Sequence, residues 1–170
     1  MEEGVLGFAP GAAVSLAKAT TPTFSAVQVG YGGIVEFYLS FKPKVGSPFG
    51  WEPIESIYQR VAEYLSEQKA VLIQERCYGE KICFREVKNV RKRIYDRYGI
   101  EGEGAFSYIG QGTQEGEGIA GVHIWAARRK NRSSEAVRPI LYKGRTIGRL
   151  FVTDSATFVS IPSVGPSLKD

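Results

Sequence analysis

The chain has 170 residues, of which 43% are hydrophobic and 24% charged, and its formal net charge is +4. This balance is typical of one globular domain and excludes a disordered chain. The net charge permits nucleic-acid binding without arguing for it. No apolar run reaches the roughly 20 residues of a membrane span, and the start Met-Glu-Glu lacks the basic segment of a secretion signal. We therefore expect a cytoplasmic protein with no membrane partner.

Metal and redox chemistry have few candidate side chains. The sequence has two cysteines, Cys77 and Cys83, and one histidine, His123. The cysteines are too few for a disulfide framework and lack the CxxC spacing, so reduced thiols are expected. A single imidazole far from both thiols in sequence argues against zinc. A carboxylate-held Mg²⁺ or Ca²⁺ stays open, although no EF-hand pattern occurs. We expect no cofactor and no metal.

Residue periodicity predicts two strand–helix units that follow one another in the chain. In one strand, Val35 and Phe37 alternate with Glu36 and Tyr38, a period of two that indicates a half-buried strand. The helices show apolar stripes, and Gly99 is suited to end the second one. In chain order we predict strands over 24–29 and 34–42, a helix over 53–68, a strand over 70–78, a helix over 84–98, and strands over 105–109 and 119–128.

The order β-β-α-β-α-β-β predicts an α+β fold, a mixed β-sheet with two helices packed on one face. Residues 24–128 would form this domain, and residues 1–23 an N-terminal arm. Residues 129–170 are predicted to be a linker and C-terminal strands. They could begin a second similar unit, since the segment from Phe158 to Ile161 faintly echoes that from Tyr38 to Phe41.

Three short segments carry a resemblance to a known family: Ile94–Tyr98, Ala105–Ser107 and Val122–Ala126. Together with the order of elements over residues 24–128, they resemble the RidA family, also called the YjgF or endoribonuclease L-PSP-like family. The resemblance implies a homotrimer with small-molecule sites in clefts between subunits. Many members hydrolyse reactive enamine or imine intermediates, and a few are described as ribonucleases. Paired-domain chorismatases and trimeric chorismate mutases share this kind of fold.

The sequence departs from the family at positions that matter for its chemistry. Phe106 stands where the family has an arginine that holds the substrate carboxylate. Lys92 falls near the helix asparagine, and Trp125 near the acidic residue that orients water. We therefore expect binding of a small carboxylated or carbonyl metabolite in an intersubunit cleft, without the usual imine-deaminase residues. If the chain is an enzyme, the resemblance implies a hydrolase or deaminase-like activity on a small metabolite.

Strand alternation places His123 and Trp125 on one face of the strand 119–128. His123 is the candidate catalytic acid or base, and Trp125 a candidate stacking wall for substrate. Phe106, Lys92 and Arg128 are the remaining candidate substrate-binding residues. His123 and Trp125 could instead only pack under a helix or in a subunit contact, where aromatic residues are common.

Two other functions stay open. The chain could be a structural or assembly module without catalysis. It could also bind or cleave RNA, through the basic second helix and the run of basic residues 128–132. Clustering of these two segments on one surface would favour RNA, although the aromatic residues that stack bases are absent from them.

Overall fold

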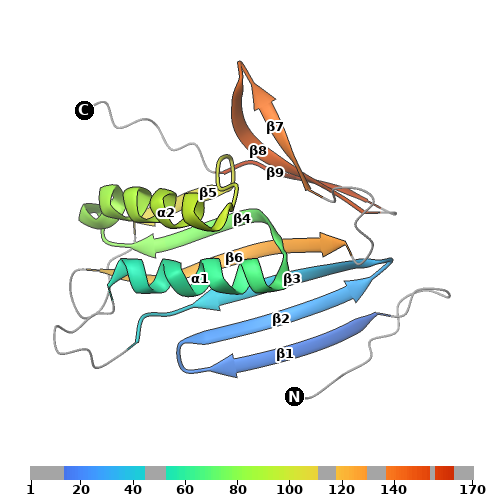
Figure 1. Cartoon of the computed structure of the whole chain (residues 1–170), viewed down its shortest axis with the longest axis horizontal. Coiled ribbons are helices and arrows are strands. Elements are labelled where there is room, and N and C mark those ends of the chain that lie inside the picture. Colours follow the sequence, from blue (N-terminus) through green and yellow to red (C-terminus); the bar gives the residue numbers. More distant parts are fainter. Residues whose placement is uncertain (1–13, 45–52, 111–117, 130–136, 154–155, 163–170) are drawn as a thin grey trace.

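The computed structural model describes residues 14–44, 53–110, 118–129, 137–153 and 156–162 (Figure 1). The elements are β1 (Ser15–Thr21), β2 (Phe24–Tyr31), β3 (Ile34–Phe41), α1 (Ile54–Gln68), β4 (Val71–Gly79), the 3₁₀ turn η1 (Lys81–Cys83), α2 (Phe84–Tyr98), β5 (Phe106–Gly110), β6 (Ile119–Arg129), β7 (Val137–Tyr142), β8 (Arg145–Val152) and β9 (Thr157–Ser160). The predicted helices and strands of residues 24–128 are thus present, with ends within a few residues of the expected ones.

A six-stranded mixed sheet forms the centre of the molecule, in the order β1-β2-β3-β6-β4-β5. The β4–β5 pair is parallel, and the other pairs are antiparallel. Both α1 and α2 lie on one face of this sheet (Figure 1). The predicted α+β class is therefore confirmed. The sheet is one strand wider than expected, because residues 15–21 of the predicted arm pair with β2 along their whole length.

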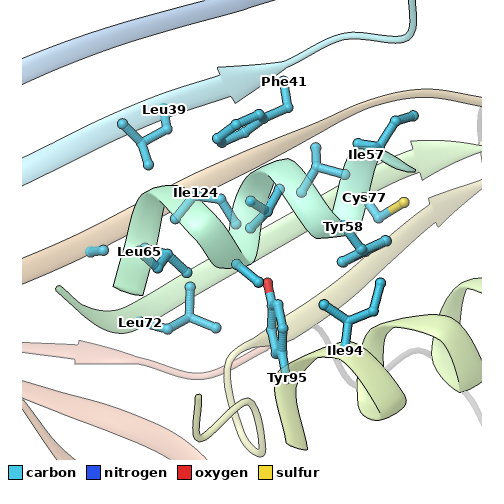
Figure 2. Packing of buried hydrophobic residues seen from close by; sticks show 14 of the residues in the cluster. Leu39, Phe41, Ile57, Tyr58, Leu65, Leu72, Cys77, Ile94, Tyr95 and Ile124 are labelled. Atoms are coloured by element: carbon cyan, nitrogen blue, oxygen red, sulfur yellow. The ribbon is translucent and has the colours of Figure 1, made fainter. Parts of the chain in front are cut away.

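The main hydrophobic core lies between the helices and the sheet, as Figure 2 shows. Alternate residues of β3, including Phe37 and Leu39, point into it, as the period of two requires. On α1 the buried positions Ile57, Val61 and Leu65 recur every four residues, which is the spacing of one helical face. The sheet face that carries the apolar alternate residues of β3 is therefore the one that the helices cover.

The two helices end in the same way but with different residues. Lys69 closes α1 with a φ of 50°, and Gly99 closes α2 with a φ of 65°. Both angles lie in the left-handed region that glycine adopts without strain, whereas a lysine there is strained. The predicted role of Gly99 is confirmed.

Strands β7, β8 and β9 form a second, three-stranded antiparallel sheet. It packs against the first sheet on the side away from the helices, through Val137 and Phe151 against Ile34, Ile73 and Ala127. Strands β7 and β8 therefore pack directly on the six-stranded sheet.

A fully buried arginine strengthens the contact between the two sheets. Arg149 of β8 is 1% exposed. Its guanidinium donates to the backbone carbonyls of Glu101 and Glu103, with N···O distances of 2.7–3.1 Å, and lies 3.3 Å from the Glu101 carboxylate. These bonds fix the second sheet to the loop between α2 and β5. Among the described residues, neither helix has the length and apolar character needed to cross a membrane.

Candidate functional site

The face of the six-stranded sheet that the helices leave free, here called the open face, carries a row of polar side chains. Strand pairing places Ser25 of β2 opposite Ser40 of β3, Ser40 opposite His123 of β6, and His123 opposite Arg76 of β4. Side chains of directly paired residues stand about 5 Å apart on the same face. These four residues, here called the polar row, therefore form a continuous line across four strands.

A second row runs beside the polar row and is richer in aromatic groups. It contains Tyr38, Trp125 and Gln74, which are paired in the same way across β3, β6 and β4. The two rows surround a hollow of about 290 Å³. The four residues of the polar row line it, together with the three of the second row, Leu39 and Ile124.

The charged groups around this hollow are cationic. Arg76 is exposed and has no hydrogen-bond or ion-pair partner among the described residues. Burial lowers the pKa of His123 below its usual value of 6.5, and the positive charges of Arg76 and Lys42 lower it further. The ring of His123 also contacts Tyr78, with the two ring centroids 4.9 Å apart. At neutral pH this imidazole is therefore uncharged and able to accept a proton.

One carboxylate lies near the hollow, but three donors already occupy it. Glu36 is 6% exposed and accepts hydrogen bonds from the hydroxyl groups of Tyr31 and Tyr38 and from the indole nitrogen of Trp125, the last at 2.8 Å. Burial and the Glu36 carboxylate raise the pKa of Tyr38 well above its usual value. Because its oxygens are engaged, Glu36 is a positioning group for Trp125 and Tyr38.

Trp125 has a structural role in addition to lining the hollow. Its ring stacks on Tyr38 at 6.2 Å and meets Phe151 and Phe158 of the second sheet edge-on at 5.8 and 6.1 Å. Trp125 therefore packs against the second sheet, on the face away from the helices, and its predicted role as a wall for substrate stays a prediction. A ligand in the hollow would lie beside the joint between the two sheets.

Three of the predicted site residues lie away from His123. Phe106 of β5 is on the helix side of the sheet, where the Arg91 guanidinium lies 4.7 Å from its ring. Lys92 is exposed on α2 and pairs with Asp96. The structure therefore brings together only His123 and Trp125 of the five candidates.

Arg128 also points to the helix side. It donates to the backbone carbonyl of Gln68 at the end of α1, with an N···O distance of 3.0 Å, and its guanidinium lies over the Phe37 ring. A cation at a helix C-terminus is favourable because that end carries partial negative charge. Arg128 is thus engaged in packing, and residues 130–132 of the predicted basic run lie outside the described residues.

The structure adds Arg76 to the site, which the sequence analysis missed. The signal was available: Arg76 alternates with Glu75 and Cys77 on β4, so its side chain must point away from the buried face. What the sequence could not give is the antiparallel pairing of β4 with β6, which places Arg76 beside His123.

A second polar cluster, also missed, lies in the core on the helix side. The fully buried Glu75 accepts hydrogen bonds from Tyr58 at 2.8 Å, from Tyr95 at 3.0 Å and from the Arg91 guanidinium at 2.8 Å. Arg91 also donates to the Gly102 carbonyl at 2.8 Å. Every described polar group of this cluster is paired, and no described cavity opens onto it. We therefore assign it to stability.

The chemistry available at the open face is that of anion binding with one proton acceptor. Within the described ranges, no three His, Cys, Asp or Glu side chains gather in a way that could hold a metal ion. Both cysteines are buried, and burial raises the pKa of Cys77 to about 12, so its thiol is unreactive in the folded chain. No family model matches this sequence, and a search of curated proteins finds no match to it.

Proposed function

We propose that this protein is an oligomer, a trimer if the sequence resemblance holds, that binds a small carboxylated or carbonyl metabolite in a cleft between subunits at the open face of its sheet. The observation that carries the proposal is the hollow, which Arg76 and His123 line side by side with no described carboxylate free to neutralise them. A guanidinium binds a carboxylate through two parallel, charge-assisted hydrogen bonds. Arg76 would hold the ligand, and His123 would face its reactive carbon or carbonyl.

The exposure of the hollow favours a site completed by a neighbouring subunit. Tyr38 on its wall is 45% exposed, and Val27 and Val29 of β2 on the same face are partly exposed. Aromatic and aliphatic side chains on an uncovered sheet face are typical of subunit contacts. In this proposal a second subunit covers these residues and closes the cleft.

Binding is a better proposal than imine hydrolysis. Hydrolysis needs a group that orients water, and the nearest carboxylate, Glu36, is held by three donors. An uncharged His123 could take a proton from a bound ligand or from water. Any catalysis would therefore depend on His123 alone among the described residues that line the hollow.

RNA binding has less support than it had from the sequence. Three of the basic residues of α2 are used in ion pairs, Arg91 with Glu75, Lys92 with Asp96 and Arg93 with Glu55. Arg128 points toward the end of α1. Three of the six basic side chains of α2, and Arg128 of the basic run, are thus engaged within the protein.

The test combines light-scattering mass with a thermal-shift screen of 2-keto acids, chorismate and a short single-stranded RNA. We expect a mass of about three chains and a rise in melting temperature with a 2-keto acid. Arg76→Gln should abolish this rise. Arg97→Gln is the matched control, because Arg97 is also exposed and unpaired among the described residues but lies on α2, on the other side of the sheet.

A monomer with no shift for any acid would overturn the proposal and leave the structural-module alternative. If Arg76→Gln and Arg97→Gln reduce the rise in melting temperature equally, the ligand binds at a site other than the hollow.

A further inference from the structure

The hydrogen-bonding capacity of the polar row exceeds what a carboxylate needs. Arg76 offers a planar fork of donors, His123 offers a ring nitrogen, and Ser25 and Ser40 each offer a hydroxyl group. These donors come from four adjacent strands and line one side of a single hollow. A carboxylate has two oxygens, whereas a phosphoryl group has three terminal oxygens that can accept bonds from such a row.

The charge around the row points to the same head group. Arg76 and Lys42 are both near enough to His123 to affect its titration, and the Glu36 carboxylate is already bonded to three donors. A phosphate monoester carries about −1.5 to −2 charges at neutral pH, against −1 for a carboxylate. Two fixed cations therefore balance a dianion, whereas they exceed the single charge of a carboxylate.

The second row would receive the rest of the ligand. Tyr38 is 45% exposed and Trp125 is partly exposed at the wall of the hollow, directly beside the polar row. Aromatic faces of this kind bind an apolar ring or chain.

We propose that the ligand of the open face is a phosphate monoester with an apolar or aromatic body, held by the polar row, and that its binding takes up a proton at His123. This inference rests on the proposed function for the hollow and its anion-binding residues, and it differs from that proposal in the anionic group of the ligand.

The proton uptake follows from the groups that face His123. These are Arg76 and Tyr78 on β4, Ser40 on β3 and Lys42 just after β3. Without a bound anion, burial and then the charges of Arg76 and Lys42 keep the pKa of His123 below 6.5, so the ring is neutral at pH 7. A dianion between these groups reverses the local potential and raises that pKa. Binding is then coupled to protonation, and affinity falls as the pH rises.

The test is calorimetry at pH 7.5 with phenyl phosphate and, as the carboxylate counterpart, phenylpyruvate. Titrations in two buffers of different ionisation enthalpy give the number of protons taken up. We expect phenyl phosphate to bind at least about tenfold more tightly than phenylpyruvate. Arg76→Gln should weaken phenyl phosphate at least about tenfold, and the control Arg97→Gln should not weaken it. His123→Asn should fold normally and take up fewer protons on binding. Because the ligand's own titration contributes equally to both proteins, the difference in uptake between them reports His123.

The outcomes separate this inference from the proposed function. If phenylpyruvate binds more tightly than phenyl phosphate, and Arg76→Gln weakens its binding, the phosphate assignment is overturned and the carboxylate proposal stands. Equal proton uptake by the wild-type chain and His123→Asn would overturn the coupling. No binding of either compound, in a chain that is also monomeric, would overturn both proposals.

Discussion

Removing the Arg91 guanidinium should destabilise the chain more than any other single loss of charge on α2. Its partner Glu75 is fully buried, and the ion pair has an N···O distance of 2.8 Å. The variant Arg91→Met keeps much of the aliphatic volume but leaves the carboxylate with only two tyrosine donors, Tyr58 and Tyr95. A buried charge that loses its counter-ion typically costs 3–5 kcal/mol, so a loss of about that size is expected.

The assay is urea unfolding followed by tryptophan fluorescence, with thermal unfolding as a second measure. For a chain of this length each kcal/mol moves the melting temperature by roughly 2–4 °C, so a fall of roughly 6–20 °C is expected. The double variant Glu75→Gln/Arg91→Met should recover at least about 1 kcal/mol relative to Arg91→Met, because the uncompensated charge is gone.

The control for this prediction is Lys92→Met, one position along the helix. The Lys92–Asp96 pair is exposed on both sides, so its loss should leave the unfolding midpoint unchanged. If Arg91→Met behaved like Lys92→Met, or if the double variant were less stable than Arg91→Met, the pairing of Glu75 with Arg91 would not stabilise the fold as argued.

Three further outcomes are expected. In urea unfolding, Lys69→Gly should stabilise the chain by about 0.5–1 kcal/mol and Gly99→Ala should destabilise it by about 1 kcal/mol, because both positions have left-handed backbone angles. Effects of the opposite sign would contradict the assignment of these two residues as helix caps. In a Cys83→Ser variant, Cys77 should react with a thiol reagent at pH 8 only after unfolding, since its pKa is raised to about 12; rapid reaction of the native chain would refute its burial. The pKa of His123 is lowered in the folded chain, so stability should fall as the pH drops below 6.5, and His123→Asn should reduce this fall; an identical pH profile in the variant would contradict the assignment.

Local patterns predicted the secondary structure well where one face of an element is buried. The alternation at Val35 and Phe37, the stripe of α1 and the glycine after α2 each reflect a local rule that the structure obeys. β1 was missed because its sequence, Ser-Leu-Ala-Lys-Ala-Thr-Thr, has no buried side chain and so no period of two to detect. Its place at the sheet edge explains this weak signal.

The site was harder to predict because it depends on pairing between strands that are distant in sequence. Alternation correctly placed His123 and Trp125 on one face, since this needs only one strand. Arg76 is 47 residues away from His123 in sequence, and only the β4–β6 register brings them together. Phe106, Lys92 and Arg128 were chosen for their type or by resemblance, and none lies on the open face.

The two buried carboxylates of the sheet explain why His123 is central to any chemistry on the open face. Glu36 lies on that face and Glu75 on the other, and each has three donors, among them two tyrosines. A carboxylate saturated in this way is held as a structural acceptor, and its oxygens are already engaged within the protein. Of the described side chains that line the hollow, His123 is therefore the accessible one whose uncharged ring can accept a proton at neutral pH. A reaction at this site that continued unchanged in His123→Asn would have to draw its proton acceptor from a second subunit.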